Sequence, residues 1–93
     1  MSGGVYIVAV EASGDALGAD LARALRTRRP DLPLLGVGLE GLASEGVQRP
    51  IDLSGLAVLG FVDGIKAYPR VKRAVEAVAA DIAVSKPEVA VLI

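Results

Sequence analysis

Short apolar runs alternate along the chain with longer segments in which apolar residues recur every three or four positions. The run Val5–Val10 (VYIVAV) is too short for a helix and rich in β-branched residues, which predicts a strand buried on both faces. Similar runs predict strands at Leu32–Val37 and Val89–Ile93. Val47–Ile51 is expected to be a short edge strand or an irregular piece, because Pro50 cannot donate a backbone hydrogen bond.

Two longer segments have helical spacing. In Asp15–Arg28, Leu17, Leu21 and Ala24 fall on one face, which we expect to pack on the sheet. A second helix is predicted to begin at Pro69, since proline is well tolerated at the first helical position. Its apolar stripe consists of Val71, Val75, Val78 and Ile82. A shorter helical stretch, ending near Gly46, is expected after the second strand.

This order of elements predicts the fold class. Strand–helix–strand units need crossover connections, so the chain is expected to form an α/β, Rossmann-like parallel sheet with helices on both faces. Residues 1–93 are predicted to be part of one domain. Because the last buried strand has no helix after it to cover it, we expect the chain to be a fragment of a larger protein.

Composition narrows the chemistry. Cysteine and histidine are absent and the net charge is −1, which argues against thiolate chemistry, most transition-metal sites and nucleic-acid binding. We therefore expect no metal and no cofactor in this chain. No signal peptide and no apolar run of about 18 residues is visible, so a cytoplasmic location is expected.

The turn after the first strand carries the most distinctive chemistry. Glu11, Ser13 and Asp15 offer a hydroxyl and two carboxylates, and Gly14 permits a tight turn or close approach of a ligand. Two carboxylates would oppose a bound phosphate but suit the hydroxyl groups of a sugar. In the alternative interpretation, Ser13 or Asp15 only caps the helix and Glu11 is solvated.

The residues EASGD, followed by Leu17-Gly18-Ala19, resemble the start of the lipid-A-disaccharide synthases. The resemblance continues, in order, through Gly36-Val37-Gly38, Glu45-Gly46, residues 56–62 and Lys86-Pro87-Glu88-Val89. Val10 and the segment Leu39–Leu42 depart from the family pattern, and the second departure puts backbone contacts of that loop in doubt.

The resemblance implies the first part of the amino-terminal domain of a two-domain, GT-B glycosyltransferase, without the carboxyl-terminal domain that holds the UDP-sugar. It implies transfer from UDP-2,3-diacylglucosamine to 2,3-diacylglucosamine-1-phosphate, giving lipid A disaccharide and UDP. The candidate catalytic base is expected just after Ile93, so this chain alone should be inactive and contain no catalytic residue. The implied substrate-binding residues are Glu11, Ser13, Gly14, Asp15, Gly36 and Gly38.

An apolar segment followed by basic residues indicates membrane contact. Apolar residues are dense between Leu53 and Ile65, and basic residues that suit anionic lipid headgroups follow directly. Ordinary core packing is the alternative. Because both implied substrates are lipids, we expect a peripheral location on the inner membrane. The residues expected to contact membrane or acyl chains are Leu56, Val58, Leu59, Phe61, Val62, Ile65, Arg70 and Arg73.

Two other functions remain open. Gly36-x-Gly38-x-x-Gly41 matches the spacing of dinucleotide-binding loops, although it follows the second strand rather than the first. The chain could also be a small, non-catalytic α/β binding module. The sequence gives no indication of oligomeric state.

Overall fold

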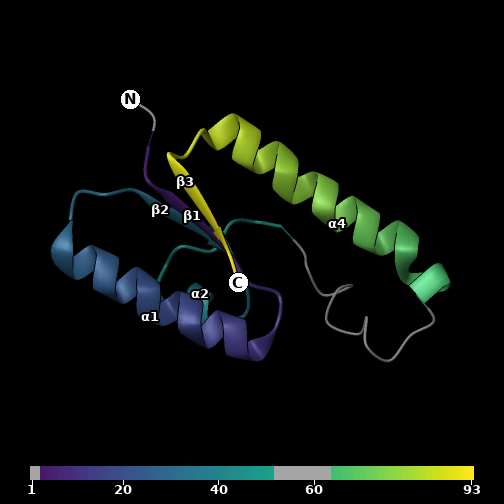
Figure 1. Ribbon diagram of the computed structural model, residues 1–93, viewed down its shortest axis with the longest axis horizontal. Helices are drawn as coiled ribbons and strands as arrows, with labels where there is room; N and C mark the ends of the chain where they lie inside the picture. Colours follow the sequence, from purple (N-terminus) through teal and green to yellow (C-terminus); the bar gives the residue numbers. More distant parts are fainter. Residues whose placement is uncertain (1–2, 52–63) are drawn as a thin grey trace.

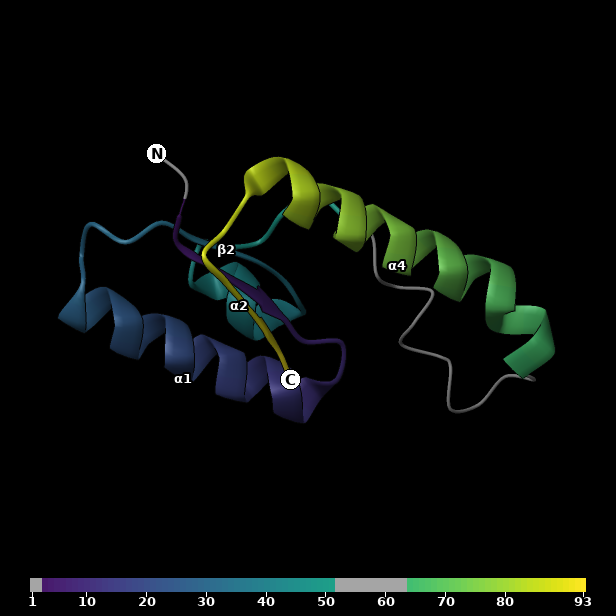
Figure 2. The same cartoon turned by 45° about the horizontal axis from the view of Figure 1, so that its top comes forward.

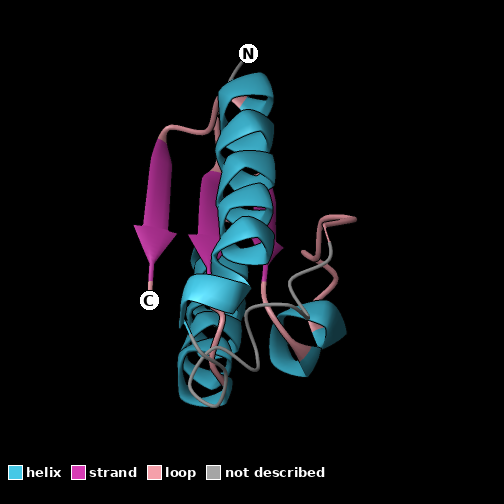
Figure 3. Cartoon of the chain, turned by 90° about the vertical axis from the view of Figure 1, so that its right-hand side faces the viewer, coloured by secondary structure: helices cyan, strands magenta, loops and turns pink. Residues whose placement is uncertain are grey.

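Three parallel strands form the sheet in the computed structural model, which describes residues 3–51 and 64–93 (Figure 1). Strand β1 (Val5–Val8) is central, between β2 (Leu34–Val37) and β3 (Val89–Leu92). Val5 pairs with Leu34 on one side and Val89 on the other. The three strand arrows point the same way in Figure 3, which confirms the predicted parallel α/β sheet.

Helices cover both faces of this sheet. Helix α1 (Ala12–Arg28) lies on one face and helix α4 (Gly64–Ser85) on the other (Figure 1). The short helix α2 (Glu40–Ser44) lies beside α1, as Figure 2 shows. It ends where the sequence predicted, because Gly46 adopts a φ of +76°, which favours glycine.

The core divides into two layers because β1 sends alternate side chains to opposite faces. Ile7 and Tyr6, neighbours in the chain, are both fully buried and lie in different layers. The prediction that β1 is buried on both faces is therefore confirmed. The α1 layer contains Ile7, Ala9, Ala22, Leu42 and Val47, whereas the α4 layer contains Tyr6, Val37 and Ala74.

The prediction for α1 was wrong in its start and in part of its buried face, since Leu21 packs against the core as predicted but Leu17 and Ala24 are exposed. The helix begins at Ala12, and Leu17 is 59% exposed. Small residues pack inward instead, because they let the helix approach the sheet closely. A methyl group added at Gly18 would lie 3.2 Å from Cγ2 of Ile7. The buried residues of α1 are Gly14, Asp15, Gly18, Ala19 and Ala22.

Helix α4 also begins earlier than predicted, at Gly64, so that Pro69 lies inside it. Proline at that position removes one hydrogen bond of the helix. Val78 and Ile82 of the predicted stripe pack on the sheet, whereas Val75 is 57% exposed. The helix ends at Ser85, and Lys86 adopts a left-handed φ of 51°.

The predicted strand at Val47–Ile51 is reduced to one isolated parallel bridge between Gly36 and Gln48. Next to the bridge, the backbone amide of Arg49 donates a hydrogen bond to the carbonyl of Gly36 over 2.7 Å. Among the helices of the described residues, none is long and apolar enough to cross a bilayer.

Candidate functional site

A pocket of about 220 Å³ lies at the carboxyl ends of β1 and β3. This is the edge of a parallel sheet where ligands bind in α/β proteins. Three of the predicted site residues, Glu11, Ser13 and Gly14, meet here. We call it the strand-end pocket, and it is lined by Val10, Glu11, Ser13, Gly14, Leu17 and Ile93.

The start of α1 leaves the polar side chains of this pocket accessible. Glu11 occupies the N-cap position with φ −121° and ψ 155°, and no side chain forms a capping hydrogen bond there. Its carbonyl accepts the first helical hydrogen bond, from the amide of Asp15 over 2.8 Å. Ser13 lies within the first turn and is exposed. The interpretation that Ser13 or Asp15 caps its own helix is therefore wrong.

Asp15 instead binds the backbone of a distant turn. Its Oδ1 accepts hydrogen bonds from the amides of Leu39 and Leu42, over 2.8 and 3.0 Å. Its Oδ2 accepts one from the amide of Gly41, over 2.6 Å. These amides are at the start of α2, so Asp15 caps the helix beside its own.

This geometry favours the charged form of Asp15. Burial raises the pKa of this carboxyl, which is only 5% exposed, but the hydrogen bonds from Leu42, Leu39 and Gly41 outweigh burial and lower the pKa below 3.8. Both carboxylate oxygens are used in these bonds. Asp15 therefore fixes the turn at the start of α2 and does not line the strand-end pocket.

The glycines of the Gly36-x-Gly38-x-x-Gly41 pattern make room for these contacts. A methyl group at Gly38 would lie 2.8 Å from Oδ1 of Asp15, and one at Gly41 would lie 2.6 Å from Oδ2. One at Gly36 would lie 2.8 Å from the carbonyl oxygen of Ile7. Gly36 and Gly38, predicted to bind substrate, thus pack against other parts of the protein and do not line the pocket.

The same contacts argue against a dinucleotide site. In such loops, glycines and free amides at the start of a helix receive a pyrophosphate. Here the carboxylate of Asp15 already occupies the amides of Leu39, Gly41 and Leu42. Leu39 adopts a negative φ of −111°, so a side chain at this position does not prevent the turn.

A partly buried polar cluster on the opposite face was not predicted from the sequence. The hydroxyl of Tyr6 donates to Oδ2 of Asp81 over 2.6 Å, and Arg49 donates to both oxygens of Asp81 over 2.8 Å each. The hydrogen bonds from Arg49 are the main reason that the pKa of Asp81 is lowered to about 2. The sequence did contain a signal for this cluster, because a tyrosine that is buried in an aliphatic strand needs a hydrogen-bond partner.

A second pocket, of about 240 Å³, is lined by residues of β1, α4 and β3. Its lining residues are all apolar, and it was not predicted from the sequence. They are Val8, Val10, Ala74, Val75, Val78, Ala79, Ile82 and Leu92.

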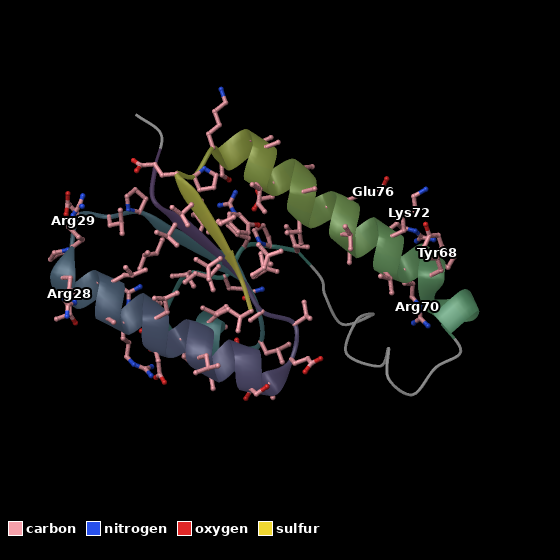
Figure 4. The ribbon with its side chains drawn as sticks, in the orientation of Figure 1. Arg28, Arg29, Tyr68, Arg70, Lys72 and Glu76 are labelled. Atoms are coloured by element: carbon pink, nitrogen blue, oxygen red, sulfur yellow. The ribbon has the colours of Figure 1, made fainter. Side chains whose placement is uncertain are left out.

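The residues predicted to contact the membrane are only partly described. Arg70 and Arg73 are exposed on α4. Figure 4 shows Tyr68, Arg70 and Lys72 at the end of α4 that extends away from the strands. The predicted contact residues Leu56, Val58, Leu59, Phe61 and Val62 lie outside the described residues, as does the side chain of Ile65.

Comparisons with known proteins agree on one family. The family model for lipid-A-disaccharide synthetase matches residues 5–93. A lipid-A-disaccharide synthase from Myxococcus xanthus is 39% identical over 89 residues, which is 96% of this chain and 23% of the relative. Those from Xanthomonas campestris and Neisseria gonorrhoeae are 39% and 42% identical, over 91% and 85% of this chain and 19% and 20% of the relatives.

The chain thus spans about a fifth of the length of the curated relatives it matches. No solved structure matches it significantly.

Proposed function

The chain belongs to the lipid-A-disaccharide synthetase family, and from this we propose that it supplies the acceptor-side wall of the active site in a lipid A glycosyltransferase. The proposed reaction transfers diacylglucosamine from its UDP carrier to diacylglucosamine-1-phosphate. One observation carries the proposal, which is that Glu11, Ser13 and Gly14 meet in a pocket at the carboxyl edge of the sheet.

The polar side of the strand-end pocket suits a sugar. The carboxylate of Glu11 can accept hydrogen bonds from sugar hydroxyls, and the hydroxyl of Ser13 can donate or accept. Both side chains are exposed at the pocket. A pocket of about 220 Å³ accommodates one sugar-sized group rather than a whole lipid.

The end of β3 supports the predicted position of the catalytic base. The amide of Ile93 still pairs with the carbonyl of Val8 over 2.9 Å, so Ile93 continues the line of the strand. A methyl group added at Gly14 would lie 3.3 Å from the carbonyl oxygen of Ile93. A residue joined to that carbonyl would leave the sheet beside the strand-end pocket, where a base could reach an acceptor hydroxyl.

The test uses the whole protein that contains this chain. Given UDP-2,3-diacylglucosamine and 2,3-diacylglucosamine-1-phosphate, it should release UDP and form the disaccharide. Replacing both Glu11 and Ser13 with Ala should lower kcat/KM by about 100-fold, because two hydrogen bonds to the acceptor are lost. Glu76→Gln, an exposed change on α4, is the control. Disaccharide formation that is unaffected by the double variant would exclude this role for the pocket.

We further propose that the protein is peripheral on the cytoplasmic face of an anionic membrane. Arg70 and Arg73 are exposed near the protruding end of α4, and each basic residue near such a surface contributes about 1 kcal/mol. Replacing both with Gln should reduce co-sedimentation with phosphatidylglycerol vesicles. The matched control replaces Arg28 and Arg29, which are exposed at the far end of α1 (Figure 4). Equal loss in both variants would indicate nonspecific charge attraction.

A further inference from the structure

The strand-end pocket is lined by two chemically different sets of side chains. Glu11 and Ser13 supply polar groups, and Val10, Leu17 and Ile93 supply an apolar wall. A ligand that fills the pocket therefore meets both hydrogen-bonding groups and hydrocarbon. A plain sugar uses only the hydrogen-bonding groups.

Leu17 contributes to this wall because of its place on α1. It follows Ser13 by four residues, so the two side chains lie on the same face of the helix. Long helical side chains lean toward the preceding turn, which here carries Ser13 and Gly14. Leu17 remains 59% exposed, and the inward face of the helix is filled by smaller residues such as Gly18. Its side chain is thus directed to the pocket rather than to the core.

Gly14 keeps the pocket open between the two apolar side chains. A methyl group added at Gly14 would lie 3.3 Å from the carbonyl oxygen of Ile93 and 3.4 Å from its Cγ2. Without that methyl group, Leu17 and Ile93 flank an open space above Val10. The gap can accept hydrocarbon from a ligand.

We propose that Leu17 is a specificity-determining residue that recognises the acyl group of an acylated amino sugar. The proposal rests on the proposed function for the identity of the sugar. The sugar hydroxyls face Glu11 and Ser13, and the first methylenes of the acyl chain lie against Leu17 and Ile93. An acceptor without a long acyl group leaves the exposed Leu17 in water, which lowers its affinity.

The experiment compares two soluble probes, N-hexanoyl- and N-acetyl-glucosamine-1-phosphate, titrated by calorimetry into the whole protein that contains this chain. Complete burial of one methylene changes affinity roughly fourfold. Because the pocket is open and buries the acyl chain only in part, the hexanoyl probe should bind about tenfold more tightly than the acetyl probe. Leu17→Ala should remove most of this preference, and the conservative Leu17→Met should retain it. Val84→Ala, which truncates a residue 79% exposed on α4, is the matched control and should change nothing.

A second measurement needs no variant. In the unchanged chain, the methyl resonances of Leu17 should shift on addition of the hexanoyl probe and not of the acetyl probe. Equal affinity for the two probes, an unchanged preference in Leu17→Ala, or absence of the methyl shift would each overturn the proposal. These results are distinct from the test of the proposed function, because a protein can prefer the acylated probe through Leu17 and still form no disaccharide.

Discussion

Two carboxylates, the buried Asp15 and the partly buried Asp81, hold the two faces of the sheet in different ways. Asp15, on the α1 face, accepts hydrogen bonds from three backbone amides of the turn at residues 39–42. Asp81, on the α4 face, accepts from two side chains, the hydroxyl of Tyr6 and the guanidinium of Arg49. Each connects segments that are far apart in the chain.

The difference shows which carboxylate controls backbone conformation. Backbone donors fix the path of the chain, so Asp15 sets the conformation of the turn at residues 39–42. The glycines at positions 38 and 41 leave room for its oxygens. Side-chain donors fix the packing of one element on another, so Asp81 attaches α4 to the sheet. Loss of Asp15 should therefore release this turn, and loss of Asp81 should weaken the attachment of α4.

The largest effect is expected from Asp15→Ala, which leaves three amides without an acceptor. Hydrogen bonds to a charged group contribute about 1.5 to 3 kcal/mol each, but not additively, so the free energy of unfolding should fall by about 3 to 4 kcal/mol. Urea denaturation followed by circular dichroism measures it. Asp15→Asn should cost nearly as much, because its NH₂ group would face amide donors.

Asp20→Ala is the matched control for Asp15. Asp20 lies on the same helix, but its side chain is 67% exposed and pairs with Arg23 at the surface. Exposed pairs contribute little to stability, so this variant should unfold at nearly the wild-type urea concentration. Equal losses in the Asp15 and Asp20 variants would mean that the buried hydrogen bonds do not stabilise the turn.

The sequence was sufficient to predict the order of elements, the parallel sheet and three residues of the pocket. These follow from local patterns and from the rule that strand ends gather at one edge. The buried face of α1 was predicted at Leu21 but otherwise missed, because the pattern gives weight to large residues such as Leu17 rather than to the small residues that allow close packing. The partners of Asp15 and Asp81 were also missed, because they are separated from them by 24 to 75 residues and local periodicity contains no such information.

An intermediate effect is expected from acid titration of Asp81. Its pKa is about 2 in the folded protein and near 3.8 without its partners, so its contribution is fully present above about pH 4 and is lost as the pH falls toward 2. The difference corresponds to about 2 kcal/mol. The measurement is the urea concentration at the midpoint of unfolding, taken between pH 2 and 5. In Asp81→Asn, the part of its pH dependence that comes from Asp81 should disappear.

Asp15 and Glu45, whose pKa values are also lowered on folding, should contribute to the slope that remains in Asp81→Asn. Glu76→Gln replaces an exposed carboxylate on the same helix and should retain the wild-type slope. If Asp81→Asn and Glu76→Gln give the same slope, the ion pair with Arg49 is not maintained in solution.

The smallest effect is expected from Tyr6→Phe, which removes one donor of Asp81 and keeps the buried ring. Arg49 still holds both oxygens of the carboxylate, so the loss should be about 1 kcal/mol. Tyr68→Phe, at a tyrosine that is 61% exposed, is the control. A double-mutant cycle of Tyr6→Phe with Asp81→Asn measures the coupling between the two side chains. If Tyr6→Phe lowers the free energy of unfolding more than Asp81→Asn does, the main partner of Asp81 is the hydroxyl of Tyr6 rather than the guanidinium of Arg49. The attachment of α4 would then depend on the central strand β1 instead of on Arg49.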